Sequence, residues 1–226
     1  MKQKIFLLAS ALLISMWGWA QGEGNIAFAD DEVKAICVAN WDTDGDGELS
    51  TAEAAAVTSL GTVFKGNTTI ASFDELQYFS GLTSISENAF KDCSALKSVI
   101  IPEGVEDIFE YAFSDCSALN SVTIPESVVN ILDFAFYQCR ALSSVILPNK
   151  LERICKSAFS WSGLTSLIIP KSVRLITTGS GRNSNYGAFS NCGRLQSIVV
   201  EEGNPNFDSR DNCNAIIRTN TNELIV

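Results

Sequence analysis

Residues 94–116 read SALKSVIIPEGVEDIFEYAFSDC, and residues 117–139 repeat this pattern as SALNSVTIPESVVNILDFAFYQC. Further copies cover 140–159 and 163–176, and a partial copy covers 81–93. The Ala-Phe pairs at 89/90, 112/113, 135/136 and 158/159 are each 23 residues apart. A fixed period of this length is typical of solenoids, in which stacked repeats share a core that one repeat could not bury alone. The sequence therefore predicts a solenoid.

Each repeat carries apolar residues at fixed positions on both sides of a proline. In the copy that begins at residue 94, Leu96, Val99 and Ile101 are predicted to point inward from a strand that Pro102 ends. The Ala-Phe pair that follows is predicted to fill the interior. The inward residues of the other copies are Leu119, Val122, Ile124, Leu142, Val145 and Leu147 on the strand side, and Val105, Ile108, Val128, Ile131, Leu151, Ile154, Val173 and Ile176 on the return side.

The outward strand positions form the surface that the repeat itself reproduces in every copy. A column of serines lies beside a second column of mostly β-branched residues, Ile100, Thr123, Ile146, Ile168 and Val199. This second column is either a protein-docking patch or a consequence of strand propensity alone. The insertion TTGSGRNSNYG at 177–187 is either a contact loop or a tolerated surface insertion.

The pattern C-x-x-L-x-x-I-x-I-P-x-x-V-x-x-I-x-x-x-A-F resembles the BspA-like subclass of leucine-rich repeats over about 140 residues. The resemblance implies a short solenoid of parallel β strands with short return segments over 65–226, with an incomplete C-terminal repeat. It also implies a bacterial surface or secreted protein that mediates adhesion or protein binding, with a protein partner or a host surface ligand. One departure is that Phe109, Leu132 and Cys155 occupy the position of the family's usual glycine.

The seven cysteines follow the repeat rather than a disulfide framework. Cys93, Cys116 and Cys139 are 23 residues apart, and Cys192 is a displaced fourth member. Stacked positions with parallel Cβ vectors leave the Cβ atoms about 5 Å apart, beyond the usual disulfide range. We therefore expect buried thiols, and the sequence gives no partner for Cys37, Cys155 or Cys213.

Residues 42–53, DTDGDGELSTAE, match D-x-[DN]-x-[DN]-G-x₅-E, the loop that wraps a calcium ion. Ca²⁺ prefers six to eight oxygen ligands, and a glycine at position 6 permits the sharp turn of such a loop. The candidate ligands, in order, are the carboxylates of Asp42, Asp44 and Asp46, the backbone carbonyl of Glu48, the hydroxyl of Ser50 and the bidentate carboxylate of Glu53.

Helical spacing is expected on both sides of this loop, over 30–41 and over 51–64. Residues 31–64 are therefore similar to an EF-hand helix–loop–helix, and this resemblance implies Ca²⁺ as the bound ion. The predicted fold class is α+β, an EF-hand-like unit followed by a short leucine-rich-repeat solenoid. The unit also resembles half of a dockerin, so the alternative function is an accessory component of an extracellular carbohydrate-degrading system. Dockerins carry two such loops, and the sequence contains one.

Residues 1–20, MKQKIFLLASALLISMWGWA, have the basic start, apolar centre and small residues at the cleavage site of a signal peptide. We expect cleavage after Ala20 and a protein that is secreted or located at the cell surface. No later stretch approaches 18 consecutive apolar residues, so a membrane span is not expected after signal removal.

The composition excludes several functions. A net charge of −10 argues against nucleic-acid binding, which needs clustered Lys and Arg. The sequence contains no histidine, which removes Ser-His-Asp and Cys-His nucleophile systems. The acidic residues near the repeats fall at solvent positions rather than in a common cleft. The sequence therefore predicts a binding protein and not an enzyme.

Overall fold

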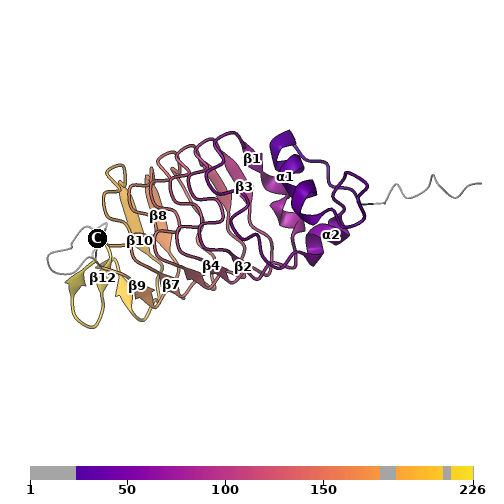
Figure 1. Cartoon of the computed structure of the whole chain (residues 1–226). Coiled ribbons are helices and arrows are strands. Elements are labelled where there is room, and N and C mark those ends of the chain that lie inside the picture. Colours follow the sequence, from indigo (N-terminus) through magenta and orange to yellow (C-terminus); the bar gives the residue numbers. More distant parts are fainter. Residues whose placement is uncertain (1–23, 179–186, 211–214, 226) are drawn as a thin grey trace, which may run out of the picture.

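The computed structural model describes residues 24–178, 187–210 and 215–225. A helical segment at the N-terminal side leads into a row of stacked coils, which follow one another in sequence order to the C-terminal strands (Figure 1). The solenoid prediction is therefore confirmed. The predicted signal peptide at 1–20, most of the 177–187 insertion and Cys213 lie outside the described residues.

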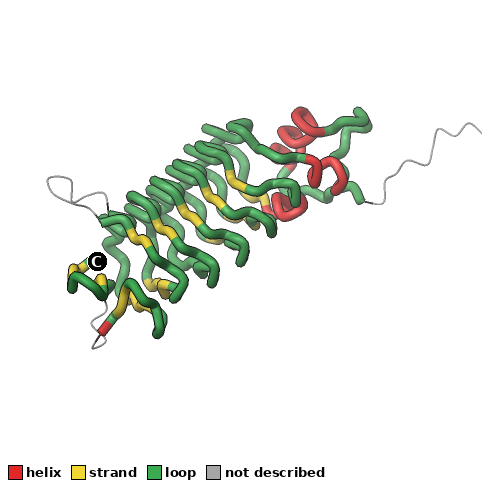
Figure 2. The backbone as a smooth tube through the Cα atoms, turned by 90° about the horizontal axis from the view of Figure 1, so that it is seen from below, coloured by secondary structure: helices red, strands yellow, loops and turns green. Residues whose placement is uncertain are grey.

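Two parallel ladders of short strands run along the stack, at equivalent places in successive coils (Figure 2). The outer ladder contains β1 (Ser72–Phe73), β3 (Ser98–Ile100), β5 (Ser121–Thr123), β8 (Ser166–Ile169) and β10 (Ser197–Val200). The return ladder contains β2 (Ser84–Ile85), β4 (Asp107–Ile108), β6 (Asn130–Ile131), β7 (Arg153–Ile154) and β9 (Leu175–Ile176). Partners such as Ser98 with Ser121 and Asp107 with Asn130 are one repeat apart, as the sequence period predicts.

The core between the ladders is a column of phenylalanine rings. Phe90, Phe113, Phe136 and Phe159 stack almost parallel, with ring centroids 5.1 to 5.2 Å apart. Phe189 continues the column at 5.9 Å from Phe159. Each of these rings is at most 3% exposed, and the alanine before each is equally buried. The prediction that the Ala-Phe pairs fill the interior is confirmed.

The repeated cysteines form hydrogen bonds from one coil to the previous one. The thiol of Cys93 donates to the carbonyl oxygen of Phe64 at 3.0 Å, and that of Cys116 donates to Phe90 at 3.0 Å. Cys139 and Cys192 bond in the same way. Burial raises the pKa of the Cys139 thiol far above its ordinary value, so this thiol stays protonated and remains a donor. All cysteines in the described residues are free thiols, which agrees with the expectation for the repeated cysteines.

The outer ladder is interrupted at one coil. Residues 144–147 carry the same strand pattern as their neighbours, yet they form no strand, and β5 and β8 belong to separate sheets. The strand expected around Val145 and Ile146 is therefore not formed at this coil. The interruption lies next to the coil whose turn is one residue shorter, where Gly163 donates its N–H to the carbonyl of Cys139 at 3.2 Å. The return ladder continues without a break through β6 and β7.

At Gly163 the backbone lies close to the backbone of the preceding coil, and this position needs a glycine. The equivalent position holds alanine at 95, 118 and 141. At Gly163, however, an added Cβ would lie 2.3 Å from the carbonyl oxygen of Arg140. Backbone atoms would have to move to accept it.

We therefore expect Gly163→Ala to destabilise the protein by about 1–3 kcal/mol, although it restores the repeat's usual residue. Urea unfolding of the variant gives this value. Gly193→Ala is the control, because an added Cβ there has no atom within 4 Å. Equal stability of the two variants would show that the short turn is not tightly packed.

The C-terminal strands leave the repeat. β11 (Phe207–Asp208), β12 (Ile217–Arg218) and β13 (Glu223–Leu224) form an antiparallel sheet after β10. Phe207 is fully buried, so this sheet packs against the last coil. None of the helices in the described ranges is long and apolar enough to cross a membrane.

Candidate functional site

The acidic loop lies between two helices at the N-terminal end of the stack. Helix α1 (Asp31–Trp41) matches the predicted first helix, and the side chain of Asp30 caps it by accepting bonds from the N–H groups of Glu32 and Val33. Helix α2 (Thr51–Ala56) begins where predicted, but it ends eight residues before Phe64. The predicted second helix is therefore too long.

The early end of α2 has a packing reason. Val57 and Thr58 are β-branched residues, which lower helix propensity, and Gly61 adopts a positive φ of 56°. Phe64 then belongs to the solenoid core, where its ring lies 5.1 Å from that of Phe90. The segment after Ala56 thus forms the first coil rather than a helix.

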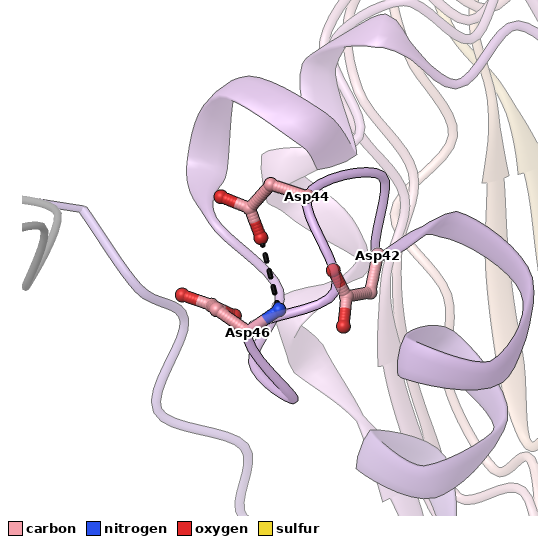
Figure 3. Close-up of side chains that lie close together, drawn as sticks. All are labelled: Asp42, Asp44 and Asp46. Atoms are coloured by element: carbon pink, nitrogen blue, oxygen red, sulfur yellow. Dashed lines mark hydrogen bonds between the residues drawn. The ribbon is translucent and has the colours of Figure 1, made fainter.

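Three aspartates come together in the loop. The carboxylates of Asp42, Asp44 and Asp46 offer oxygen atoms that all lie within 4.8 Å of one another (Figure 3). Backbone N–H groups of the loop hold them in place: Asp42 accepts bonds from Gly45 and Gly47, and Asp44 accepts one from Asp46. Carboxylate oxygens at this spacing are the hard donors that Ca²⁺ prefers. The donor set therefore fits the predicted ion.

The carboxylates of Glu48 and Glu53 do not belong to this cluster. The Glu48 carboxylate forms an ion pair with Lys34 at 2.6 Å, although only its backbone carbonyl was predicted as a ligand. The hydroxyl of Ser50 donates to Glu53 at 2.9 Å and caps α2. Glu53 accepts bonds from the N–H groups of Ser50 and Thr43, which lower the pKa of its carboxyl to about 2. Glu53 is thus ionised and spans the loop from its second to its ninth position.

A short N-terminal segment forms a β-bridge with the end of the loop, and the sequence did not predict it. Asn25 forms an antiparallel bridge with Ser50, Ile26 donates its N–H to the carbonyl of Leu49 at 2.8 Å, and Thr51 donates to Gly24 at 2.8 Å. The Ile26 side chain is buried, as is that of Leu49. Three residues carry too little periodicity to predict a strand, so only the isolated apolar Ile26 indicated this contact.

Two acidic side chains join this N-terminal unit to the first coil. Asp30 accepts a bond from the N–H of Ala71 at 2.6 Å in addition to capping α1. Glu75 is 9% exposed and accepts a bond from the N–H of Ala29 at 2.8 Å. The rings of Trp41 and Phe79 also meet edge to face at 5.4 Å. The acidic loop is therefore attached to the solenoid rather than hinged from it.

The second candidate site is the outer face of the stack. Side chains of the predicted outward column are most exposed in its C-terminal half, where Ile146 is 86%, Ile168 64% and Val199 44% exposed. The first member, Ile100, is only half exposed. The predicted outward direction is confirmed. A groove of about 390 Å³ lies beside Ile146 and Ile168, where the outer ladder is interrupted.

Two half-buried aromatic residues of successive coils are paired with each other. The rings of Tyr111 and Phe134 stack at 4.9 Å, Lys91 lies over Tyr111, and Lys156 lies over Phe134. Both outer ring faces of this pair are therefore covered by ammonium groups. Such an arrangement stabilises adjacent coils and leaves no free ring face for a ligand.

The architecture defines a leucine-rich-repeat solenoid with a helical cap. A family described as BspA type leucine rich repeat region, in six copies, matches residues 63–186, which are more than half of the chain. The chain belongs to this family. No catalytic family is indicated, and proteins of this fold typically act by binding other proteins. Among curated proteins, none matches the sequence.

Several solved structures are similar. A leucine rich cell surface protein from Faecalibacterium prausnitzii is 28% identical, with a TM-score of 0.52 over 75% of this chain and 49% of that one. A leucine-rich repeat protein from Eubacterium ventriosum is 27% identical, with a TM-score of 0.51 over 62% of this chain and 35% of that one. The T. pallidum leucine rich repeat protein is 30% identical, with a TM-score of 0.48 over 52% of this chain and 51% of that one. The chain spans from about a third to half of the length of these proteins.

Proposed function

We propose that this protein is exported and acts at the cell surface or outside the cell as a calcium-binding adhesion module. Its partner is another protein or a host surface ligand, and it binds on the outer face of the solenoid. The observation that carries the proposal is the exposure of Ile146 and Ile168 on the outer face of neighbouring coils. Folding does not require large apolar side chains at positions that face solvent, whereas an interface uses them as its desolvated centre.

Membership of a family with cell-surface relatives supports the proposed location. The signal-like segment at 1–20 agrees with it. The dockerin-like alternative is less well supported, because the described ranges contain one acidic loop and the segment at Asn25 pairs with it. In a two-loop module, a second loop would be expected to provide this pairing.

Calcium is the second part of the proposal. Asp42, Asp44 and Asp46 would hold the ion, and Glu53 would complete the site if its carboxylate turned from Thr43 toward the cluster. The bound ion would neutralise the three carboxylates and stiffen the loop. Because the loop is attached to the first coil, a stiffer loop would stabilise the end of the stack on which the binding face begins.

We expect Ile146→Lys to weaken binding of the protein partner at least tenfold while the fold stays intact. The side chain is 86% exposed, so the charged replacement remains solvated in the free protein. A pull-down from host cell-surface proteins, with Ca²⁺ or with a chelator, gives the partner and its affinity. Thermal unfolding checks the fold.

Thr123→Lys is the matched control, because Thr123 belongs to the same column and is exposed, but it does not line the groove. This variant should bind the partner as tightly as the parent protein does. If Ile146→Lys also keeps full affinity, the exposed column reflects strand propensity alone, and the proposed binding face is wrong.

A further inference from the structure

The groove beside Ile146 crosses several coils of the stack. Its wall contains the strand positions 144–147 of one coil and 166–168 of the next. Glu126 borders it on the preceding coil, and Glu201 borders it on the following one. The groove therefore runs along the stacking direction, with exposed isoleucines in its centre and one carboxylate toward each end.

The backbone along this groove has unused hydrogen-bonding groups. The N–H groups of Ser144, Val145, Ile146 and Leu147 have no acceptor within the part of the chain that the structure describes. In the coil at Gln196, by contrast, the N–H groups of Gln196 and Ser197 both donate to the carbonyl of Thr165. These unpaired N–H groups lie where the outer ladder is interrupted, at residues that line the groove.

The two carboxylates are held in place and lack a cationic partner. Glu126 accepts a bond from the N–H of Asn149 at 2.8 Å, and Glu201 accepts one from the N–H of Lys171 at 3.0 Å. Neither carboxylate forms an ion pair within the described ranges. The lining of the groove contains no lysine or arginine, although the exposed Lys150 and Lys171 each follow a residue that lines it. The groove is therefore acidic at both ends and apolar between them.

We infer that this groove binds an extended segment of a partner protein that carries an apolar side chain between two lysines or arginines. This inference rests on the proposed function of the outer face and names the chemistry of its partner. Glu126 and Glu201 belong to coils three positions apart, but their carboxylates accept bonds from the N–H groups of Asn149 and Lys171 in neighbouring coils, so the two carboxylates are at most about 11 Å apart. Basic residues two positions on either side of an apolar residue in an extended chain start about 13 Å apart, and their long flexible side chains can converge on the two carboxylates. The basic residues of the segment are therefore expected at positions i and i+4, with the apolar residue at i+2 above Ile146 and Ile168.

Synthetic peptides test this inference directly on the full protein. The probe is a fluorescently labelled, blocked peptide Gly-Lys-Ser-Ile-Ser-Lys-Gly, whose binding is followed by anisotropy at low ionic strength. We expect saturable binding that weakens as salt is raised, because exposed charges are screened. A peptide with both lysines replaced by glutamate, and one with isoleucine replaced by serine, should each bind at least tenfold more weakly.

Protein variants locate the site. Glu126→Gln combined with Glu201→Gln keeps the acceptor oxygens and removes the charges, so it should weaken the lysine peptide about tenfold. Glu103→Gln is the matched control, because Glu103 follows the proline of its own coil, is exposed and lies outside the groove. Lys171→Ala should strengthen binding two- to threefold by removing a cation beside Glu201, which accepts the backbone N–H of Lys171.

The outcomes separate this inference from the function on which it rests. It is supported if the basic peptide binds, the double glutamine variant loses this binding and Glu103→Gln keeps it. It is overturned if the serine or glutamate peptide binds equally well, or if no peptide binds while Ile146→Lys still abolishes capture of the protein partner. In that last case the outer face binds its partner with another chemistry. If neither peptide binding nor partner binding responds to any change at the groove, the proposed binding face is also wrong.

Discussion

Phe136→Ala is expected to destabilise the protein by about 4 kcal/mol, the largest effect of any single truncation that we predict. The ring is fully buried between Phe113 and Phe159, at 5.2 Å from each. Truncation removes both stacking contacts and leaves a cavity that neighbouring coils cannot close, because their own rings fix the spacing. Since native domains are stable by about 5–15 kcal/mol, this loss is a large part of the total.

Urea unfolding followed by both circular dichroism and fluorescence measures this loss and shows whether the stack still unfolds as one unit. Tyr137→Ala is the control, because this ring is the next residue and is only half buried. It should cost about 1 kcal/mol. A Phe136→Ala variant that kept its stability and lost partner binding would place the ring on the binding surface instead of in the core.

The end of the ring column gives a further comparison. Phe189 stacks on Phe159 on one side and borders a pocket of about 450 Å³ on the other. Its truncation should therefore cost less than that of Phe136, because fewer contacts are lost and solvent reaches the site more easily. A smaller loss at Phe189 would show that each coil is stabilised by its two neighbours, as expected for a solenoid.

The repeat was predictable because one residue pattern determines both the spacing and the direction of the side chains. Leu96, Val99 and Ile101 point inward as predicted, and the strand partners of β3 and β5 differ by one period. The interruption at 144–147 was not predictable from that segment, because its pattern is the same as in the paired coils. The sequence difference lies in the next turn, at Gly163. Its effect on the outer ladder depends on how closely the backbones of two coils approach there, which the sequence does not show.

The N-terminal unit shows a different limit of the sequence. The motif at 42–53 predicted the loop, and the structure brings Asp42, Asp44 and Asp46 together. Alanine content suggested a helix as far as Phe64, but the solenoid core takes that ring, and tertiary packing overrides a weak propensity. The bridge at Asn25 involves too few residues to produce a pattern, so apart from the isolated apolar Ile26 nothing in the sequence indicated it.

Asp46→Asn is expected to remove most of the calcium binding that we propose for this loop. A lone extracellular loop should bind Ca²⁺ with a dissociation constant on the order of 10⁻⁴–10⁻³ M. Asparagine keeps the side-chain oxygen that accepts the N–H of Glu48 at 2.8 Å, so the loop conformation is preserved while one negative charge is lost. Glu53→Gln should have the same effect, because it removes the charge of the predicted bidentate ligand. Glutamine also serves in a capping box with Ser50, so the start of α2 should be preserved.

Calorimetric titration with Ca²⁺ measures the affinity, and we expect at least a tenfold loss of affinity in each variant. Asp31→Asn is the control, because it removes an exposed charge from the first turn of α1, outside the loop. Thermal unfolding gives a second reading: a ligand at 100 times its dissociation constant stabilises the native state by about 2.7 kcal/mol. This gain should be present in the parent and in Asp31→Asn and absent in Asp46→Asn. Titration curves that coincide for all of these proteins would mean that the three aspartates do not hold the ion, and that the loop is an acidic turn closed by its own backbone hydrogen bonds.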